Sequence, residues 1–266
     1  MKDPFLLQKM PLMGHLQELR QRLLWCLLLF VGHTIVCYIF AQDILVFLTR
    51  PLAALFEGQI GRRFIYTGLT EAFMSYLKAA CFAGLCLSCP WWAFHLWRFI
   101  SQGLYPEEQR SYRWFFLLVP VLFFTGATLA YTVVCPCAWK FFLSFESTQG
   151  LVPLQFEARI SEYLGLMLKL MSVFGLGFQL PIILALCVLF RLISLSILKQ
   201  CRKYAFLIIT VVAALITPPD LISPLGLILP MYGLYEMTLF ALSYKERSST
   251  TARLEKKNDI DIDGSF

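Results

Sequence analysis

Long apolar runs separated by short polar segments dominate this chain. Six runs with almost no charged residues lie at 23–40, 72–94, 114–134, 163–190, 204–217 and 225–244. Apolar residues are continuous within each run, whereas the strands of a membrane barrel would alternate apolar and polar positions. Backbone groups in hydrocarbon must form their hydrogen bonds inside their own segment, so the pattern predicts six membrane-spanning helices. We therefore expect an all-α integral membrane protein.

The composition agrees with a membrane setting. Hydrophobic residues make up 58% of the 266 residues, charged residues only 15%, and the mean hydropathy is +0.67. A soluble domain of this size could not cover so much apolar surface. We expect a polar N-terminal segment at 1–22, a six-helix membrane domain at 23–244, and a polar, disordered tail at 245–266.

The positions of Lys and Arg predict the orientation. Counted outside the apolar runs, sixteen fall on the side that carries both termini and five on the other side. Basic residues concentrate in cytoplasmic segments, so both termini are expected in the cytoplasm. The net charge of +6 then reflects topology and attraction to anionic lipid, with no need for a nucleic-acid partner.

The apolar runs differ in length. The run at 163–190 would span about 42 Å as a helix, so we expect it to tilt or kink, with Pro181 as the kink. The run at 204–217 would span only about 21 Å, less than the roughly 30 Å hydrocarbon core. A short fifth helix should thin the bilayer around it. The connections at 43–71 and 135–162 are expected as long loops on the outer side.

Two acidic residues are the candidate binding groups. Glu18 precedes the first run, and Glu108 follows Pro106 in the short segment between the second and third runs. Two carboxylates at one membrane surface suit guanidinium groups, which they bind bidentately. The local alternatives are an ion pair of Glu18 with Arg22 one turn later, and helix-dipole stabilisation of Glu108. Phe99, on the same side, is otherwise explained by an interfacial aromatic belt.

Polar residues inside the apolar runs offer a second hypothesis. Gln179 lies deep in the fourth run, and Lys78 and Lys169 are the only lysines within runs. Intramembrane polar groups often bond across helices or mark a transport pathway. A small-solute transporter that uses these three residues is therefore the alternative function, whereas packing between helices is the simpler explanation for Gln179.

Enzymatic chemistry has little support in the sequence. The three histidines are far apart, and neither a metal-ligand spacing nor a nucleophile elbow, phosphate loop or dinucleotide fingerprint occurs. Asp220, in the segment TPPD, has the sequence of a turn residue. We expect no enzyme activity, cofactor or metal site.

Four segments resemble the TatC family, the multi-spanning receptor subunit of the twin-arginine protein translocase. They are HLQELRQRL at 15–23, WRFISQGLYPEEQR at 97–110, FGLGFQLP at 174–181, and RKYAFLIITVVAALITPPDLISPLGLILPMYGLYE at 202–236. Each short match alone is weak, but four in order at the expected places of a six-span topology are highly specific. The resemblance covers nearly the whole chain except its tails.

This resemblance implies a function and a set of residues. In the family, the two acidic positions help to receive the paired arginines of a folded cargo's signal peptide. The matching residues here are Glu18 and Glu108, with Phe99 as the loop aromatic and Arg20 beside the first acid. Structural or assembly roles fall on three further matching positions: Pro51, Pro181 and Asp220.

The family also implies the setting. Single-span TatA- and TatB-type partners, several copies in one complex, and export driven by the proton-motive force across the bacterial cytoplasmic membrane are expected. The implied fold is a concave helix bundle with short fifth and sixth helices. One position departs from the family: Gln179 stands where a glutamate is usual. Glutamine can contact a partner helix through hydrogen bonds but cannot hold a charge, which argues against a proton role there.

Overall fold

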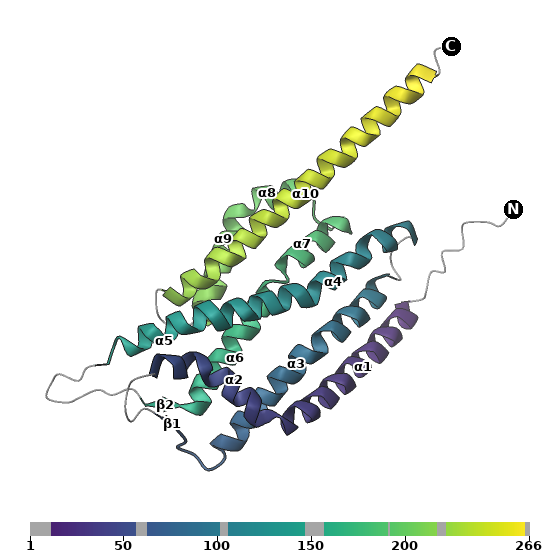
Figure 1. Cartoon of the computed structure of the whole chain (residues 1–266). Helices are drawn as coiled ribbons and strands as arrows, with labels where there is room; N and C mark the ends of the chain where they lie inside the picture. The colour runs from purple at the N-terminus through teal and green to yellow at the C-terminus, as the bar shows by residue number, and fades with distance from the viewer. Residues whose placement is uncertain are drawn as a thin grey trace. The chain divides into compact units, whose positions relative to one another are not determined.

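A computed structural model gives the fold (Figure 1). It describes the backbone of residues 12–56, 63–101, 106–146, 157–190, 192–216 and 222–263, and side chains at 13–14, 16–56, 63–101, 116–146, 157–190, 192–215 and 224–244. Two compact units are present: Met1–Phe124 with Glu157–Leu168, called unit 1, and Thr125–Phe156 with Lys169–Phe266, called unit 2.

Helices form nearly all of the described chain. In chain order they are α1 (Leu12–Ile39), α2 (Ala41–Ala53), α3 (Glu71–Ile100), α4 (Pro106–Leu129), α5 (Cys135–Leu143), α6 (Ile160–Gly177), α7 (Leu180–Leu189), α8 (Leu195–Gln200), α9 (Arg202–Ile216) and α10 (Ile222–Asp263). A 3-10 turn follows α2 at Ala54–Phe56, and a π-helical segment joins α4 to α5 at Ala130–Val134. Two short strands, β1 (Phe64–Ile65) and β2 (Ala158–Arg159), pair in parallel.

Five helical stretches in the described chain are long and apolar enough to cross a membrane. They are Leu16–Ile39, Glu71–Ile100, Phe116–Leu143, Ile160–Leu189 and Pro224–Tyr244. The fifth predicted run corresponds to α9, which has only 15 residues and is about 22 Å long. The all-helical membrane fold is therefore confirmed. α9 is as short as the sequence predicted, and its place as a fifth spanning helix stays a prediction.

The sixth helix differs from the expectation of a short one. α10 has 42 residues, and its apolar part at Pro224–Tyr244 has an ordinary spanning length of 21. The backbone stays helical through the polar segment for which the sequence favoured disorder. Neither glycine nor proline occurs between Gly233 and Gly264, so no residue there imposes a helix end.

Both long connections also contain helix where the sequence suggested loop. In the first, Leu45, Leu48 and Leu52 recur at helical spacing and form the buried face of α2. In the second, the third apolar run continues as α5 to Leu143. Pro136 cannot donate a hydrogen bond, and the π-helical segment that precedes it accommodates this loss: the N–H of Cys135 bonds to the carbonyl of Ala130.

The fourth run is interrupted near Pro181, as expected. α6 ends at Gly177, and α7 begins at Leu180, so that Pro181 occupies the first turn of the new helix. Proline is tolerated there because that turn has no intrahelical acceptor for its missing N–H. The N–H of Gln179 bonds to the carbonyl of Leu176 at 3.0 Å, a tightened last turn of α6. The break therefore lies at residues 178–179, just before the proline.

In unit 1, α1 and α3 lie side by side along most of their length (Figure 1). A Cβ atom built on Gly84 of α3 would stand 2.9 Å from the Cα of Thr34, so only glycine permits this approach. Small buried residues extend the contact: Cys37 and Ala41 pack against Ala80. A hydrogen bond of 2.9 Å between His33 Nδ1 and Ser88 Oγ adds a polar link.

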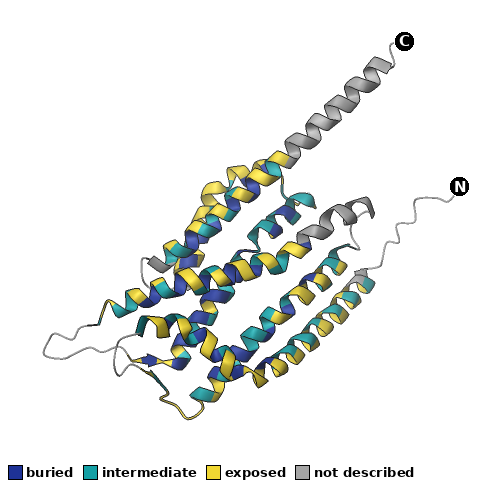
Figure 2. Cartoon of the chain, viewed as in Figure 1, coloured by how far each residue is buried: buried dark blue, intermediate teal, exposed yellow. Residues whose placement is uncertain are grey.

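In unit 2, α10 is the central helix, in contact with α5, α7, α8 and α9. A buried cluster of Leu195, Leu198, Tyr235 and Leu239 fixes α8 against α10. The Tyr235 hydroxyl donates a 2.7 Å hydrogen bond to the carbonyl of Leu198. Figure 2 shows exposed residues along the outward faces of many helices, α1 and α9 among them. Large apolar side chains such as Leu23, Leu28 and Leu207 are exposed, as lipid contact requires.

Glycine at position 84 is expected to determine the stability of unit 1. Gly84→Ala should lower the free energy of unfolding by about 1–3 kcal/mol, because the added methyl meets the backbone of Thr34. Gly32→Ala is the matched control on the partner helix, since a Cβ there meets no atom within 4 Å and alanine favours helix. Thermal unfolding of the purified protein measures both. Equal melting temperatures for the two variants would contradict the tight α1–α3 contact.

Candidate functional site

The antiparallel pairing of α1 and α3 places the Glu18 end of α1 beside the Phe99 end of α3. The ring centroids of Tyr38 and Phe73 lie 6.4 Å apart near one end of the pair, and those of Phe30 and Trp92 lie 6.4 Å apart nearer the other. Residue numbers thus rise along α1 as they fall along α3. Glu18 and Phe99 therefore belong to the same end of unit 1, called the Glu18 end below.

Glu18 forms an ion pair with Arg22 one helical turn later. The Nε atom of Arg22 donates to Glu18 Oε1 at 2.9 Å, and Nη2 of the same guanidinium donates to the same oxygen. The exposed fractions are 14% for the Arg22 side chain and 22% for the Glu18 side chain, so the pair is largely covered. The local alternative drawn from the sequence, an i,i+4 pair, is therefore present in the structure.

Two further arginines lie at this end of unit 1. Arg20 is exposed on the turn between Glu18 and Arg22, and Arg98 is exposed on α3. Arg22 and Arg98 both lie close enough to His95 for their charges to act on its ring. The Glu18 carboxylate is thus an acidic group on a basic surface. Such a surface attracts anions in general, and it attracts a cation only at the carboxylate itself.

Phe99 and Glu108 lie on either side of the short connection from α3 to α4. Phe99 is half-buried in the last turn of α3, and the ring of Trp97 packs on Phe116 of α4 with centroids 4.8 Å apart. This contact joins the end of α3 to α4. Glu108 is in the first turn of α4, two residues after Pro106, as the sequence predicted; its side chain lies outside the described residues.

Gln179 lies at the break between α6 and α7, in unit 2. Its side chain is half-buried, and Nε2 donates to the carbonyl of Gly175 at 3.4 Å. The carboxamide therefore bonds to the last turn of α6, whose carbonyls lack helical partners. This bond is local, between residues four positions apart, so the packing and partner-contact alternatives for Gln179 stay predictions.

The other predicted residues have different surroundings. Pro51 is in the last turn of α2, next to the buried Leu52, and Pro181 opens α7. Asp220 lies outside the described residues. Lys78 on α3 and Lys169 on α6 are both exposed on the surfaces of their units. Neither lysine is enclosed by side chains of its own unit, as a polar pathway within that unit would require.

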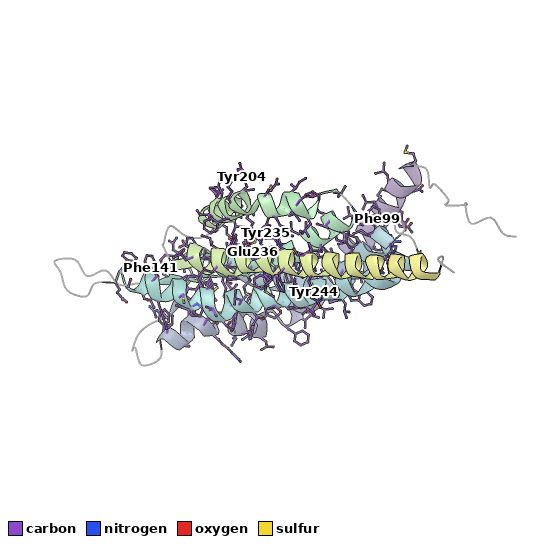
Figure 3. All side chains as sticks on the ribbon, turned by 90° about the horizontal axis from the view of Figure 1, so that it is seen from above. Phe99, Phe141, Tyr204, Tyr235, Glu236 and Tyr244 are labelled. Atoms are coloured by element: carbon purple, nitrogen blue, oxygen red, sulfur yellow. The ribbon has the colours of Figure 1, made fainter. Side chains whose placement is uncertain are left out.

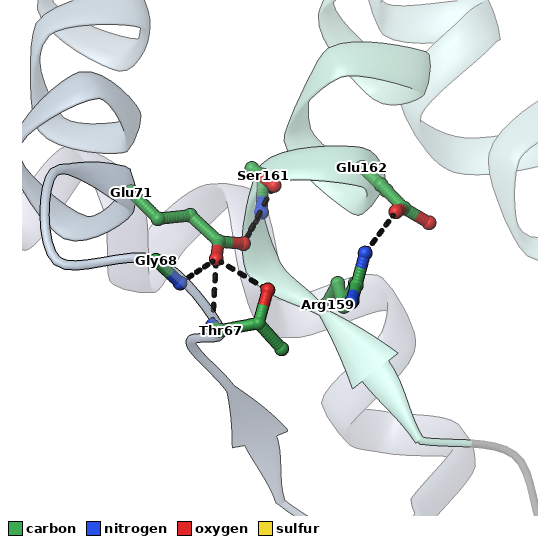
Figure 4. A network of polar contacts seen from close by, with 6 residues as sticks. All are labelled: Thr67, Gly68, Glu71, Arg159, Ser161 and Glu162. Atoms are coloured by element: carbon green, nitrogen blue, oxygen red, sulfur yellow. Dashed lines mark hydrogen bonds and ion pairs between the residues drawn. The ribbon is translucent and has the colours of Figure 1, made fainter.

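At the opposite end of α3, Glu71 is the acceptor in a polar cluster that no sequence pattern indicates, called the Glu71 cluster below (Figure 4). The Glu71 carboxylate accepts hydrogen bonds from the Ser161 hydroxyl at 2.6 Å, from the Thr67 N–H at 2.7 Å and from the Gly68 N–H at 3.1 Å. Ser161 begins α6, ninety residues further along the chain. The carboxylate therefore ties the start of α3 to the start of α6, beside the pairing of β1 with β2.

A second missed cluster joins α9 to α10. Figure 3 marks Tyr204 on α9 and Glu236 on α10. The Arg202 guanidinium, at the start of α9, pairs with Glu236 at 3.2 Å, and the Tyr232 hydroxyl donates to the same carboxylate at 3.0 Å. Glu236 and Arg202 are 34 positions apart, a separation that no local spacing rule relates. Only the packing of the two helices could reveal that this intramembrane acid is neutralised.

No group of three potential metal ligands occurs within the described side chains. The nine cysteines, all of them in described segments, are unbridged. At the Glu18 end, the described chemistry is a carboxylate bonded to the Arg22 guanidinium, with aromatic and basic side chains on the same end of the unit.

Known proteins of one family are similar to this chain over most of its length. Residues 14–230 match the family model described as Sec-independent protein translocase protein (TatC). A TatC protein of Rickettsia prowazekii (strain Madrid E) is 39% identical over 236 residues, which cover 89% of this chain and 94% of that protein. One of Magnetococcus marinus (strain ATCC BAA-1437 / JCM 17883 / MC-1) is 40% identical over 233 residues, covering 88% and 84%.

A solved structure has the same fold. The crystal structure described as twin arginine translocase receptor TatC in DDM superposes with a TM-score of 0.74 at 30% identity. The match covers 85% of this chain and 98% of that one.

The membrane-length helices and these matches together define the class of protein, which is a multi-spanning membrane component of a protein translocase. The chain belongs to the TatC family of Sec-independent protein translocase proteins. The resemblance inferred from the four sequence segments is thereby confirmed. The protein has a transport role in the Tat system, as a subunit that works with other Tat components, and the solute-transporter alternative loses its basis.

The Glu71 cluster is expected to hold the segments around β1 and β2 together. Glu71→Ala removes the acceptor shared by Thr67, Gly68 and Ser161, so amide hydrogen exchange at 64–68 and 158–162 should rise by roughly fivefold or more. Glu162→Ala is the matched control, because that exposed carboxylate bonds only locally, to Arg159 at 3.2 Å. Unchanged exchange in Glu71→Ala would show that the strand pair alone holds this region.

Proposed function

We propose that this TatC-family protein is the receptor for twin-arginine signal peptides of folded cargo, and that Glu18 and Glu108 bind the two arginines. The observation that carries the proposal is the placement of Glu18, Phe99 and the first turn of α4 at one end of unit 1. A related solved structure is itself described as a twin arginine translocase receptor.

The chemistry of the two acids fits this ligand. A carboxylate binds a guanidinium through two charge-assisted hydrogen bonds, whereas an ammonium group offers only a point charge. Glu18 already holds one guanidinium, that of Arg22, so its carboxylate is compatible with the group that it would receive from cargo. Phe99 supplies an aromatic surface beside the site, and Arg20 orients the exposed turn that carries Glu18.

The membrane arrangement is part of the same proposal. Six spans, with α9 as a short fifth, place both termini and the Glu18 end in the cytoplasm, and the protein resides in the bacterial inner membrane. The bundle is concave and receives the apolar stretch of the signal peptide. TatA- and TatB-type single-span proteins assemble with several copies of this chain, and Gln179 contacts a helix of such a partner. The proton-motive force drives export of the cargo. Thinning of the bilayer beside α9 lowers the barrier to cargo passage.

Site-specific photocrosslinking tests the receptor role. A photoreactive residue at Gln17 or Gln21, both exposed beside Glu18, should crosslink to a precursor with an Arg-Arg signal in native membranes, and not to one with Lys-Lys. Glu108→Gln and Glu18→Gln should each lower the crosslink yield by about tenfold or more, because a charge-assisted hydrogen bond is lost.

Glu107→Gln is the matched control, since it removes a carboxylate from the same helical turn and should leave the yield unchanged. Equal crosslinking with Arg-Arg and Lys-Lys signals would exclude arginine recognition at this end. Equal yields in Glu107→Gln and Glu108→Gln would show that acids in this turn serve the helix dipole alone.

A topology measurement tests whether α9 spans the membrane. Reporters inserted within 217–221 and fused after residue 266 should lie on opposite sides, with the latter in the cytoplasm. Both reporters in the cytoplasm would mean that α10 does not cross, and an external C-terminus would mean that α9 does not.

A further inference from the structure

We propose that Arg22 acts as an internal competitor of the cargo arginine at Glu18, so that signal-peptide binding is an exchange of one guanidinium for another. This inference rests on the proposed receptor function. Arg22 would then set the affinity of the site: a signal peptide binds only as well as it can displace a residue that already fills the carboxylate.

The geometry of the pair supports this role. Two nitrogen atoms of Arg22, Nε at 2.9 Å and Nη2, donate to the single oxygen Oε1 of Glu18. The guanidinium thus takes up the same kind of charge-assisted contact that an incoming arginine would make. Only 14% of the Arg22 side chain and 22% of the Glu18 side chain are exposed, so a cargo arginine cannot simply add to the outside of an open pair.

Tethering makes Arg22 a strong competitor. The two side chains are one helical turn apart on α1, and the helix holds them within reach of each other without an encounter step. Once displaced, Arg22 would face the cationic groups of its own surroundings, since Arg20 is exposed on the same turn and Arg98 lies near His95 on α3. Removal of Arg22 from Glu18 therefore costs the site electrostatic energy in addition to the lost bonds.

The proposed competition predicts how the affinity and the selectivity for signal peptides change when Arg22 is removed. An internal competitor lowers the apparent affinity of every ligand by the same factor, the fraction of sites in which Glu18 is open. Arg-Arg and Lys-Lys signals should therefore both gain affinity when Arg22 is removed, while the ratio of their affinities stays constant. A weak signal that normally falls below the threshold for transport would then bind measurably.

The test is binding of a fluorescent signal peptide to the full-length protein in lipid nanodiscs, with Arg-Arg and Lys-Lys versions of the same peptide. Arg22→Gln should tighten both by roughly three- to tenfold, the range for opening a partly covered intrahelical pair. Arg22→Lys should tighten both by less, because lysine keeps the charge but loses the planar fork. Arg159→Gln is the matched control: it removes a cation from the exposed pair with Glu162 and should change neither affinity.

Each outcome is decisive. If Arg22→Gln weakens binding or leaves it unchanged while Glu18→Gln abolishes it, Arg22 merely positions the carboxylate, so the competition is overturned and the receptor function stands. If Glu18→Gln has no effect on either peptide, the proposed role of Glu18 in the receptor fails. Thermal unfolding of each variant identifies a folding defect. If Arg22→Gln does not fold, the Arg22→Lys variant tests the competition: tighter peptide binding supports it, and weaker or unchanged binding overturns it.

Discussion

The close approach of α1 and α3 is the constraint on which the Glu18 end of unit 1 depends. Inside a lipid bilayer the hydrophobic effect contributes little to the association of helices. Their association therefore depends on van der Waals contact and on hydrogen bonds across the interface. Gly84 allows the backbone of α3 to meet Thr34, and His33 bonds to Ser88 one turn further along. This contact fixes the antiparallel register, and the register in turn brings Glu18 and Phe99 to one end.

Three acidic groups near the membrane are compensated inside the chain, each in a different way. Glu18 pairs with Arg22 within one helix, Glu236 pairs with Arg202 between two helices, and Glu71 accepts backbone and hydroxyl hydrogen bonds. An uncompensated charge in hydrocarbon is costly, which explains why these acids are satisfied at rest. Under the proposed receptor function, the cargo arginine would exchange with the Arg22 partner that already compensates Glu18.

Two interruptions of the helices coincide with prolines. Pro181 opens α7 after a two-residue break, and Pro136 follows a π-helical segment that relieves its missing hydrogen bond. In both cases the freed backbone groups are bonded locally: Gln179 bridges the first break through its own N–H and side chain. Helices that change direction in this way need no exposed backbone polar groups in lipid.

Continuous apolar runs, basic residues at one set of ends and four motif segments were enough to establish the helical membrane fold, the short α9, the break near Pro181 and the family. Those properties depend on local composition and spacing, which the sequence displays directly. The sequence did not show that α2 and α5 occupy the long connections or that α10 continues past Tyr244. Nor did it show that Glu71 bonds to Ser161 and Arg202 pairs with Glu236. Partners ninety and thirty-four residues apart are chosen by the packing of whole helices, and only the tertiary structure decides which side chains that packing brings within bonding distance.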